Sequence, residues 1–165
     1  MADKTYHVLF VCTGNSARSI LAEALMNDMG KDRGFKAYSA GSHPKGAVHP
    51  WALKTLQQHR LPIDGYRSKS WEEFARPDAP DLHFVFTVCD QAAGEVCPVW
   101  PGQPMTAHWG MPDPAAVEGD DAVREKAFLD TIITMKRRIQ LMLSLPLASL
   151  DRMAIQKEIK DIGSR

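Results

Sequence analysis

The sequence has no excess of charge of either sign and no long apolar run. Lys and Arg together number 20 and Asp and Glu together number 20, so the formal net charge at pH 7 is zero. A balanced chain offers no extended basic face, and we therefore expect neither a nucleic acid nor a membrane surface as partner. The first apolar run, residues 8–11, is far shorter than the roughly 20 residues that span a bilayer. We expect a soluble, cytoplasmic protein.

Cysteine is scarce as well, and two common nucleotide motifs are missing. The three cysteines are Cys12, Cys89 and Cys97, and an odd number without an apolar leader argues against a structural disulfide framework. No Gly-x-Gly-x-x-Gly pattern and no Gly-Lys-Ser/Thr phosphate loop occurs in the chain. These absences disfavour nucleotide binding and leave reactive, metal-binding or merely buried thiols.

Short β-rich runs alternate with amphipathic segments through most of the 165 residues. The expected strands are residues 6–11, 35–39, 82–88 and 105–108, and the expected helices are 19–29, 50–59, 120–142 and 149–162. Val123 is the first apolar residue expected on the buried face of the 120–142 helix. The alternation predicts an α/β fold with an open four-stranded parallel sheet flanked by helices, in flavodoxin-like layers. Because Pro146 interrupts the helical pattern, we assign 1–145 to the domain and 146–165 to a C-terminal helical appendage.

The loop between the first expected strand and helix has the residues needed to bind an oxyanion. Cys12 opens this loop and is followed by Thr13, Gly14, Asn15, Ser16, Ala17, Arg18 and Ser19. Successive backbone amides and a helix N-terminus can converge on one anion, and Arg18 adds a bidentate guanidinium. The same positive field stabilises a thiolate at Cys12. The loop therefore predicts a nucleophilic thiol beneath a bound tetrahedral dianion.

Three further assignments refine this loop and add an acid. We expect Gly14 to permit close approach of the backbone to the ligand, Asn15 to brace the loop, and Ser19 to donate to the thiolate. Asp113 lies in a Pro-Asp-Pro sequence after the last expected strand and is the candidate general acid. An ordinary Asp-Pro turn explains the same residues, so both interpretations of Asp113 stay open.

The remaining cysteines also have more than one interpretation. Cys89 follows the third expected strand, so it should lie at the same edge of a parallel sheet as Cys12. Cys89 and Cys97 are interpreted as a redox relay, as inert buried thiols, or as zinc ligands with His108. Zinc-ligand spacing is absent, which disfavours the last of these.

The loop sequence Val-Leu-Phe-Val-Cys-Thr-Gly-Asn-Ser-Ala-Arg-Ser resembles the opening of low-molecular-weight protein tyrosine phosphatases and their arsenate reductase relatives. Thr-Val-Cys-Asp around Cys89, then Cys97-Pro98, His108-Trp109-Gly110 and Asp113-Pro114-Ala115 are similar to the reductase branch. The phosphatase branch has aromatic residues after its Asp-Pro pair, where this chain has Ala115, Ala116 and Val117. The resemblance therefore favours the reductase branch.

The resemblance implies a thiol-dependent reduction of arsenate that needs no cofactor and no metal and serves arsenic detoxification. Cys12 is the implied nucleophile and Asp113 the acid, while Cys89 and then Cys97 carry the disulfide outward to thioredoxin or to glutathione with glutaredoxin. Phosphate or sulfate would bind as analogues, and we expect a monomer or weak homodimer. A tyrosine phosphatase that uses Cys12, and a non-catalytic oxyanion-binding module, are the alternatives.

Some of these reductases also bind potassium behind the loop through Asn, Glu, Ser and Asp side chains. Asn15, Glu23 and Ser39 match three of the positions, and Lys69 stands at the fourth. We expect the Lys69 ammonium to replace the ion, although a solvated lysine is the alternative. Surface or structural roles are the expectation for five histidines, namely His7, His43, His49, His59 and His83. Three tryptophans, Trp71, Trp100 and Trp109, are expected to be packing residues or loop anchors rather than a stacking platform. The last helix is expected to cap the domain rather than pair with a second chain.

Overall fold

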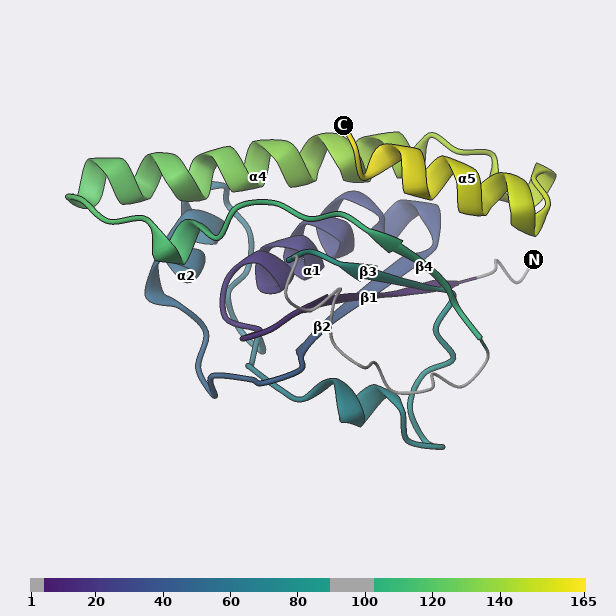
Figure 1. Cartoon of the computed structure of the whole chain (residues 1–165), viewed down its shortest axis with the longest axis horizontal. Helices are drawn as coiled ribbons and strands as arrows, with labels where there is room; N and C mark the ends of the chain where they lie inside the picture. The colour runs from purple at the N-terminus through teal and green to yellow at the C-terminus, as the bar shows by residue number, and fades with distance from the viewer. Residues whose placement is uncertain (1–4, 90–102) are drawn as a thin grey trace.

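A four-stranded parallel sheet forms the centre of the molecule (Figure 1). This computed structural model describes residues 5–89 and 103–165. The strands are β1 (Tyr6–Cys12), β2 (Phe35–Gly41), β3 (Phe84–Thr87) and β4 (Met105–His108), in the order β2-β1-β3-β4. Every neighbouring pair is parallel. The expected strand number and direction are confirmed, and β2 and β4 form the edges.

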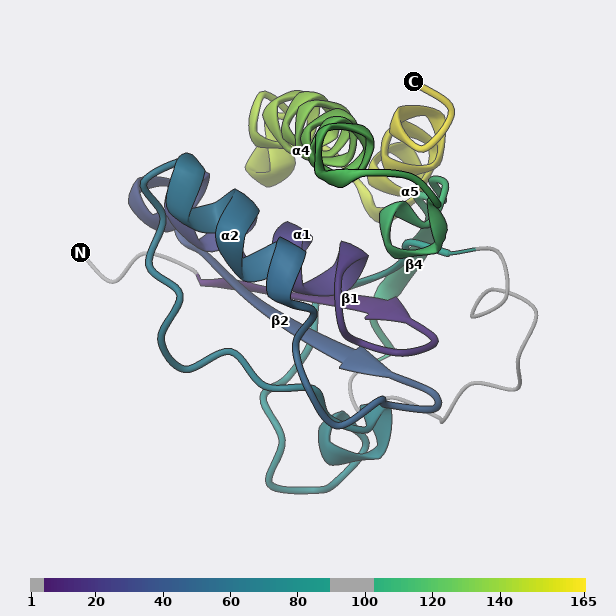
Figure 2. The ribbon, with the colours of Figure 1, turned by 90° about the vertical axis from the view of Figure 1, so that its left-hand side faces the viewer.

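Figure 2 shows the four long helices together on one side of the sheet, while η2 and its flanking loops lie on the other side. The long helices are α1 (Arg18–Met29), α2 (Pro50–Gln58), α4 (Asp121–Leu143) and α5 (Arg152–Ile162). Single 3₁₀ turns are η1 (Lys31–Arg33), η2 (Trp71–Phe74), η3 (Pro114–Ala116) and η4 (Leu147–Ser149). None of the helices in the described part of the chain is long and apolar enough to cross a membrane.

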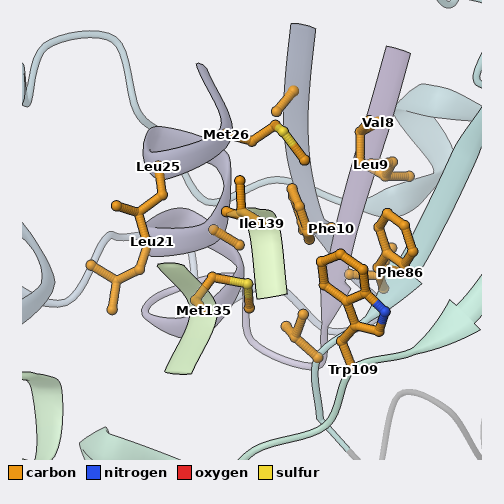
Figure 3. Packing of buried hydrophobic residues seen from close by; sticks show 14 of the residues in the cluster. Val8, Leu9, Phe10, Leu21, Leu25, Met26, Phe86, Trp109, Met135 and Ile139 are labelled. Carbon is orange, nitrogen blue, oxygen red and sulfur yellow. The ribbon is translucent and has the colours of Figure 1, made fainter. Parts of the chain in front are cut away.

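The core forms where the central strands meet α1 and α4 (Figure 3). Residues 8–11 of β1 are 0 to 1% exposed, as expected for a strand covered on both faces. Phe10 of β1 stacks on Phe86 of β3, and Phe86 stacks on Trp109 with ring centroids 3.9 Å apart. Removal of these rings from water contributes to the stability of the sheet, at about 25 cal/mol for each Å² of apolar surface.

Two sequence expectations about the helices are wrong. Val123 was expected on the buried face of α4, but it is 45% exposed, because the first turn of α4 projects beyond the sheet (Figure 1). The last helix was expected from Ser149, but η4 forms there and α5 begins at Arg152. Asp151 sets that start, since its side chain accepts a hydrogen bond from the Ala154 amide at 2.8 Å.

The C-terminal helix α5 packs against β4 and α4. This agrees with the expected capping role within the chain. The division of the chain at residues 145 and 146 stays a prediction.

Truncation of Phe86 tests the aromatic stack in the core. We expect Phe86→Ala to lower the free energy of unfolding by about 3–5 kcal/mol, because a cavity replaces a fully buried ring. Urea denaturation followed by circular dichroism measures the change. Leu129→Ala, at a position that is 40% exposed, is the control and should cost less than about 0.5 kcal/mol. Equal costs for the two variants would contradict this description of the core.

Candidate functional site

The carboxyl ends of all four strands contribute to one cavity. Cys12 ends β1, residues 42–49 follow β2, Cys89 follows β3 closely, and residues 109–113 follow β4. The cavity has a volume of about 480 Å³ and is lined by Cys12, Thr13, Gly14, Ser16, Ala17, Arg18, His43, Lys45, Cys89, Met111, Pro112 and Asp113. It lies where the chain order reverses between β1 and β3, the usual ligand crevice of an open parallel sheet.

The segment after β2 fixes the orientation of the loop between β1 and α1. The carbonyls of Thr13, Gly14 and Ser16 accept hydrogen bonds from the amides of His43, Lys45 and His49 at 2.8–2.9 Å. In a trans peptide the N–H of the next residue points away from the carbonyl. The amides of Gly14, Asn15 and Ala17 are therefore turned away from the 42–49 segment. This orientation suits an oxyanion cradle.

Asn15 braces the loop, as expected from the sequence. Its backbone has a φ of 46°, in the left-handed region that Asn tolerates better than most residues. The buried side chain accepts from the Lys69 amide at 2.8 Å and donates to the Ser19 hydroxyl at 2.8 Å. Asn15 thus joins the loop to both α1 and the chain that precedes η2.

The Cys12 sulfur lies at the bottom of this cradle. It is 2.9 Å from the Ser19 hydroxyl and accepts from the Asn15 amide at 3.2 Å. The N-terminus of α1 has no side-chain cap and no acidic residue in its first turn. Its unpaired amides and partial positive charge are therefore available to an anion or a thiolate. The contact of Ser19 with the thiol, expected from the sequence, is present.

Cys89 reaches the same cavity from β3. Its sulfur accepts from the Thr13 amide at 3.2 Å and lies 3.5 Å from the Thr13 hydroxyl. Within residues 5–89 and 103–165, Cys12 and Cys89 are unpaired, buried thiols on the wall of one cavity. The expectation that β3 brings Cys89 to the Cys12 loop is confirmed. Cys97 and Trp100 lie outside the described residues.

Arg18 and Asp113 face each other across the cavity. The Arg18 guanidinium donates to the Met111 carbonyl at 2.9 Å and lies 3.7 Å from the Asp113 carboxylate. The other carboxylate oxygen of Asp113 accepts from the Ala115 amide at 2.9 Å, which begins η3. One oxygen of Asp113 thus caps a turn while the other faces the site. The turn interpretation is confirmed, and the position also suits an acid.

Three residues of the site escaped the sequence analysis. A Cβ added at Gly41 would lie 2.5 Å from the Thr13 carbonyl oxygen, so the close approach of two backbones occurs there. At Gly14, the three atoms nearest to an added Cβ belong to the flexible Lys45 side chain, at 3.1–3.3 Å, and the expected close approach of Gly14 to a ligand stays a prediction. His43 and Lys45 line the cavity with cationic or polar groups. Both residues directly follow the second expected strand, and this position could have predicted that they border the site.

Lys69 is buried behind the loop, with 9% of its surface exposed. The solvated interpretation of Lys69 is therefore wrong. Its ammonium donates to the Arg67 carbonyl at 3.0 Å. Burial lowers the pKa of Lys69, and the charge of Glu23 opposes that shift. Burial raises the pKa of Glu23, whose carboxylate accepts from the Ser39 hydroxyl at 2.6 Å. An ammonium group cannot ligate a cation, and Lys69 stands where a fourth oxygen ligand would be needed, so these residues do not fit a potassium ion.

The other candidate groups have structural contacts. Trp71 and Trp109 are buried at 7% and 0% exposure, as expected for packing residues. His7 contacts the Tyr38 hydroxyl at 2.9 Å, and His83 accepts from the His7 amide at 3.0 Å. Within residues 5–89 and 103–165, no group of three or more His, Cys, Asp or Glu residues is placed to hold a metal ion.

The fold and the cavity together define a class. The class consists of α/β proteins that hold a tetrahedral oxyanion above a nucleophilic cysteine. These proteins bind the anion with the loop after the first strand and with an arginine at the start of the following helix. The chain belongs to the low molecular weight phosphotyrosine protein phosphatase family, whose profile matches residues 7–153.

The curated relatives of this chain include several arsenate reductases. The arsenate reductase of Halalkalibacterium halodurans is 36% identical over 121 residues, which covers 73% of this chain and 83% of that relative. The arsenate reductase of Bacillus subtilis is 35% identical over 114 residues, covering 69% of this chain and 78% of the relative. These relatives belong to the reductase branch of the family.

Solved structures agree in fold. An arsenate reductase in its phosphate-binding state superposes with a TM-score of 0.64 at 25% identity, covering 82% of this chain and 98% of the other. The thioredoxin-dependent arsenate reductase of Corynebacterium glutamicum gives 0.57 at 26% identity, covering 86% and 65%. A low molecular weight protein tyrosine phosphatase from T. tengcongensis gives 0.59 at 22% identity, covering 82% and 99%, and it shows the shared fold alone.

Substitution of Gly41 tests the close approach between β2 and the loop. We expect Gly41→Ala to destabilise the protein by about 1–3 kcal/mol, because the Thr13 carbonyl is backbone and must shift. Gly14→Ala is the matched control, and it should cost less than about 1 kcal/mol, since the Lys45 side chain can move aside. Thermal or urea unfolding measures both. A larger loss for Gly14→Ala than for Gly41→Ala would contradict this packing.

Potassium titration tests the assignment of Lys69. We expect the melting temperature to be the same in potassium chloride and in sodium chloride at equal ionic strength, because the buried ammonium already supplies the positive charge beside Glu23. Lys69→Met, which keeps the bulk and removes the charge, should be less stable in both salts. A potassium-specific rise in the melting temperature of the unmodified protein would disprove the assignment.

Proposed function

We propose that the protein is an arsenate reductase that acts through Cys12, Cys89 and Cys97. The observation that carries the proposal is the convergence of two buried thiols, Cys12 and Cys89, on one cavity. A phosphatase needs only the first of these thiols, whereas a two-electron reduction needs a second. The arsenate reductase names of the sequence relatives support the same activity.

The first step is attack of the Cys12 thiolate on the arsenic atom of arsenate. The loop amides and Arg18 hold the remaining oxygens, and Asp113 gives its proton to the oxygen that leaves as water. A sulfur–arsenic bond forms and an arsenic–oxygen bond breaks. The product is a covalent Cys12 adduct that still contains As(V).

The second step is the reduction. The Cys89 thiolate attacks the Cys12 sulfur, so the sulfur–arsenic bond breaks and its electron pair stays on arsenic. Arsenite with As(III) leaves, and a disulfide joins Cys12 to Cys89. The contacts of the Cys89 sulfur with Thr13 support this step, because Thr13 directly follows Cys12 in the chain. Cys97 then attacks Cys89, which frees Cys12 and moves the disulfide outward.

A reduced thiol partner completes the cycle by opening the Cys89–Cys97 disulfide. Thioredoxin is the first choice, with the thioredoxin-dependent relative of Corynebacterium glutamicum in its support, and glutathione with glutaredoxin is the second. The proposed setting is arsenic detoxification in the cytoplasm by a monomer or weak homodimer. No metal or cofactor takes part in the proposed steps.

The alternative is a tyrosine phosphatase that uses Cys12, Arg18 and Asp113 and leaves Cys89 without a role. The residues that follow Asp113 argue against a tyrosine phosphatase. They are Ala115, Ala116 and Val117, and none of them offers an aromatic ring to a phosphotyrosine. We therefore keep phosphatase activity as a side reaction of the same site.

Replacement of Cys89 separates the two functions. We expect Cys89→Ser to abolish arsenate-dependent oxidation of thioredoxin, and of glutathione with glutaredoxin, because no thiol then attacks the Cys12 adduct. Inorganic phosphate should still bind with unchanged affinity, since the cradle is intact. Cys12→Ser is the matched control and should remove both reduction and any aryl phosphate hydrolysis.

Mass spectrometry after one arsenate turnover should find a Cys12–Cys89 disulfide that passes to Cys89–Cys97. The proposal fails if neither reductant supports turnover by the unmodified protein while aryl phosphates are hydrolysed efficiently. It also fails if Cys89→Ser reduces arsenate at the unmodified rate.

A further inference from the structure

The C-terminal helix α5 runs along the open edge of β4 (Figure 1). The Arg152 side chain donates to the Gln103 carbonyl, and Gln156 donates to the Thr106 carbonyl, both at 2.7 Å. An uncovered edge strand presents such carbonyls to solvent or to another chain. Helix α5 thus satisfies part of the edge of β4 and fixes its position against the strand.

Contact between α5 and the end of β4 is closest around Trp109. The indole nitrogen donates to the Ile159 carbonyl at 2.9 Å, and the ring is buried against Phe86, as Figure 3 shows. A Cβ added at Gly163 would lie 2.2 Å from the His108 carbonyl oxygen. Only glycine permits this approach, so the end of α5 and the end of β4 are fitted to each other.

Arg138 of α4 forms hydrogen bonds with both the end of β4 and the end of the chain. Its buried guanidinium donates to the carbonyls of Trp109 and Gly110, at 2.7 and 3.1 Å, and to the Arg165 carbonyl at 3.1 Å. The acceptors at Trp109 and Gly110 are peptide carbonyls, whereas Arg165 is the last residue of the given sequence. A buried charge is costly, and burial lowers the pKa of Arg138. Its placement suggests a role in holding backbone geometry.

The carbonyls held by Arg138 directly precede the segment that carries Asp113. Next along the chain, the Met111 carbonyl accepts from Arg18, and the Asp113 carboxylate faces the same guanidinium at 3.7 Å. Two arginines therefore fix residues 109–113, Arg138 at the start and Arg18 at the end. The family profile ends at residue 153, so most of α5 and the chain after it lie beyond the matched region.

We infer that Arg138, together with the packing of α5 against β4, positions Asp113 over the Cys12 site. This inference rests on the proposed role of Asp113 as the acid. Arg138 touches neither thiol nor cavity and is a positioning residue. Its effect on the reaction must pass through Asp113, whereas binding of the anion depends on the loop and Arg18.

A double-mutant cycle tests this dependence. Arg138→Lys keeps the charge but loses the fork that holds three carbonyls. In the otherwise unmodified protein, we expect kcat/KM for arsenate reduction to fall by about tenfold, since a misplaced catalytic group is costly. In an Asp113→Asn background, the same change should lower kcat/KM by less than about twofold. The dissociation constant of inorganic phosphate should stay within about twofold throughout.

The matched control is Arg137→Lys, at the exposed position directly before Arg138 on the same helix, and it should leave kcat/KM unchanged. Gly163→Ala should lower kcat/KM in the same way as Arg138→Lys, with a loss that depends on Asp113, and Ser164→Ala is its control. If Arg138→Lys does not fold, the Gly163→Ala cycle tests the inference instead. Equal losses with and without Asp113, or a parallel loss of phosphate affinity, would show a general structural role and overturn the inference. A folded Arg138→Lys with unchanged kinetics would overturn it as well.

The outcome is separable from that of the proposed function. If the protein does not reduce arsenate but hydrolyses para-nitrophenyl phosphate, the proposed function fails. The same cycle is then measured on hydrolysis, which needs the same acid. If neither reaction occurs, Asp113 is not an acid and the inference fails with it.

Discussion

The buried Asn15 side chain is the contact on which the shape of the site depends. It joins the Lys69 amide to the Ser19 hydroxyl, and Ser19 in turn contacts the Cys12 sulfur. A left-handed residue in a tight loop needs such support, because the strained backbone is retained only where the surrounding contacts determine it. The thiol, the loop amides and the start of α1 therefore share one buried hydrogen-bond network.

The parallel sheet explains why four distant parts of the sequence meet at this network. Parallel strands present all of their carboxyl ends at one edge, so Cys12, the 42–49 segment, Cys89 and the Asp113 segment arrive together. The core contributes rigidity, since Phe10, Phe86 and Trp109 stack directly beneath this edge. Fixed strand ends are what allow two buried thiols to face the same ligand.

Much of this arrangement was predictable from local patterns. The run of apolar residues in β1, the Cys12–Arg18 loop and the Asp-Pro pair all carry their signal within a few residues. The prediction for Val123 was wrong because it depended on distant packing: Val123 has the right helical spacing but projects past the sheet. Lys69 was ambiguous because burial of a lysine leaves no mark on its neighbours in sequence.

The sequence by itself determined the fold class and singled out the Cys12–Arg18 loop with its candidate nucleophile, because hydrophobic period and loop composition are local properties. Only the tertiary structure decided that Gly41 must lack a side chain, that His43 and Lys45 border the cavity, and that Arg138 and α5 hold the Asp113 segment. Each of these depends on two backbones, or a side chain and a backbone, meeting across many residues of chain. Such distances are fixed by packing against the sheet, and no short stretch of sequence contains them.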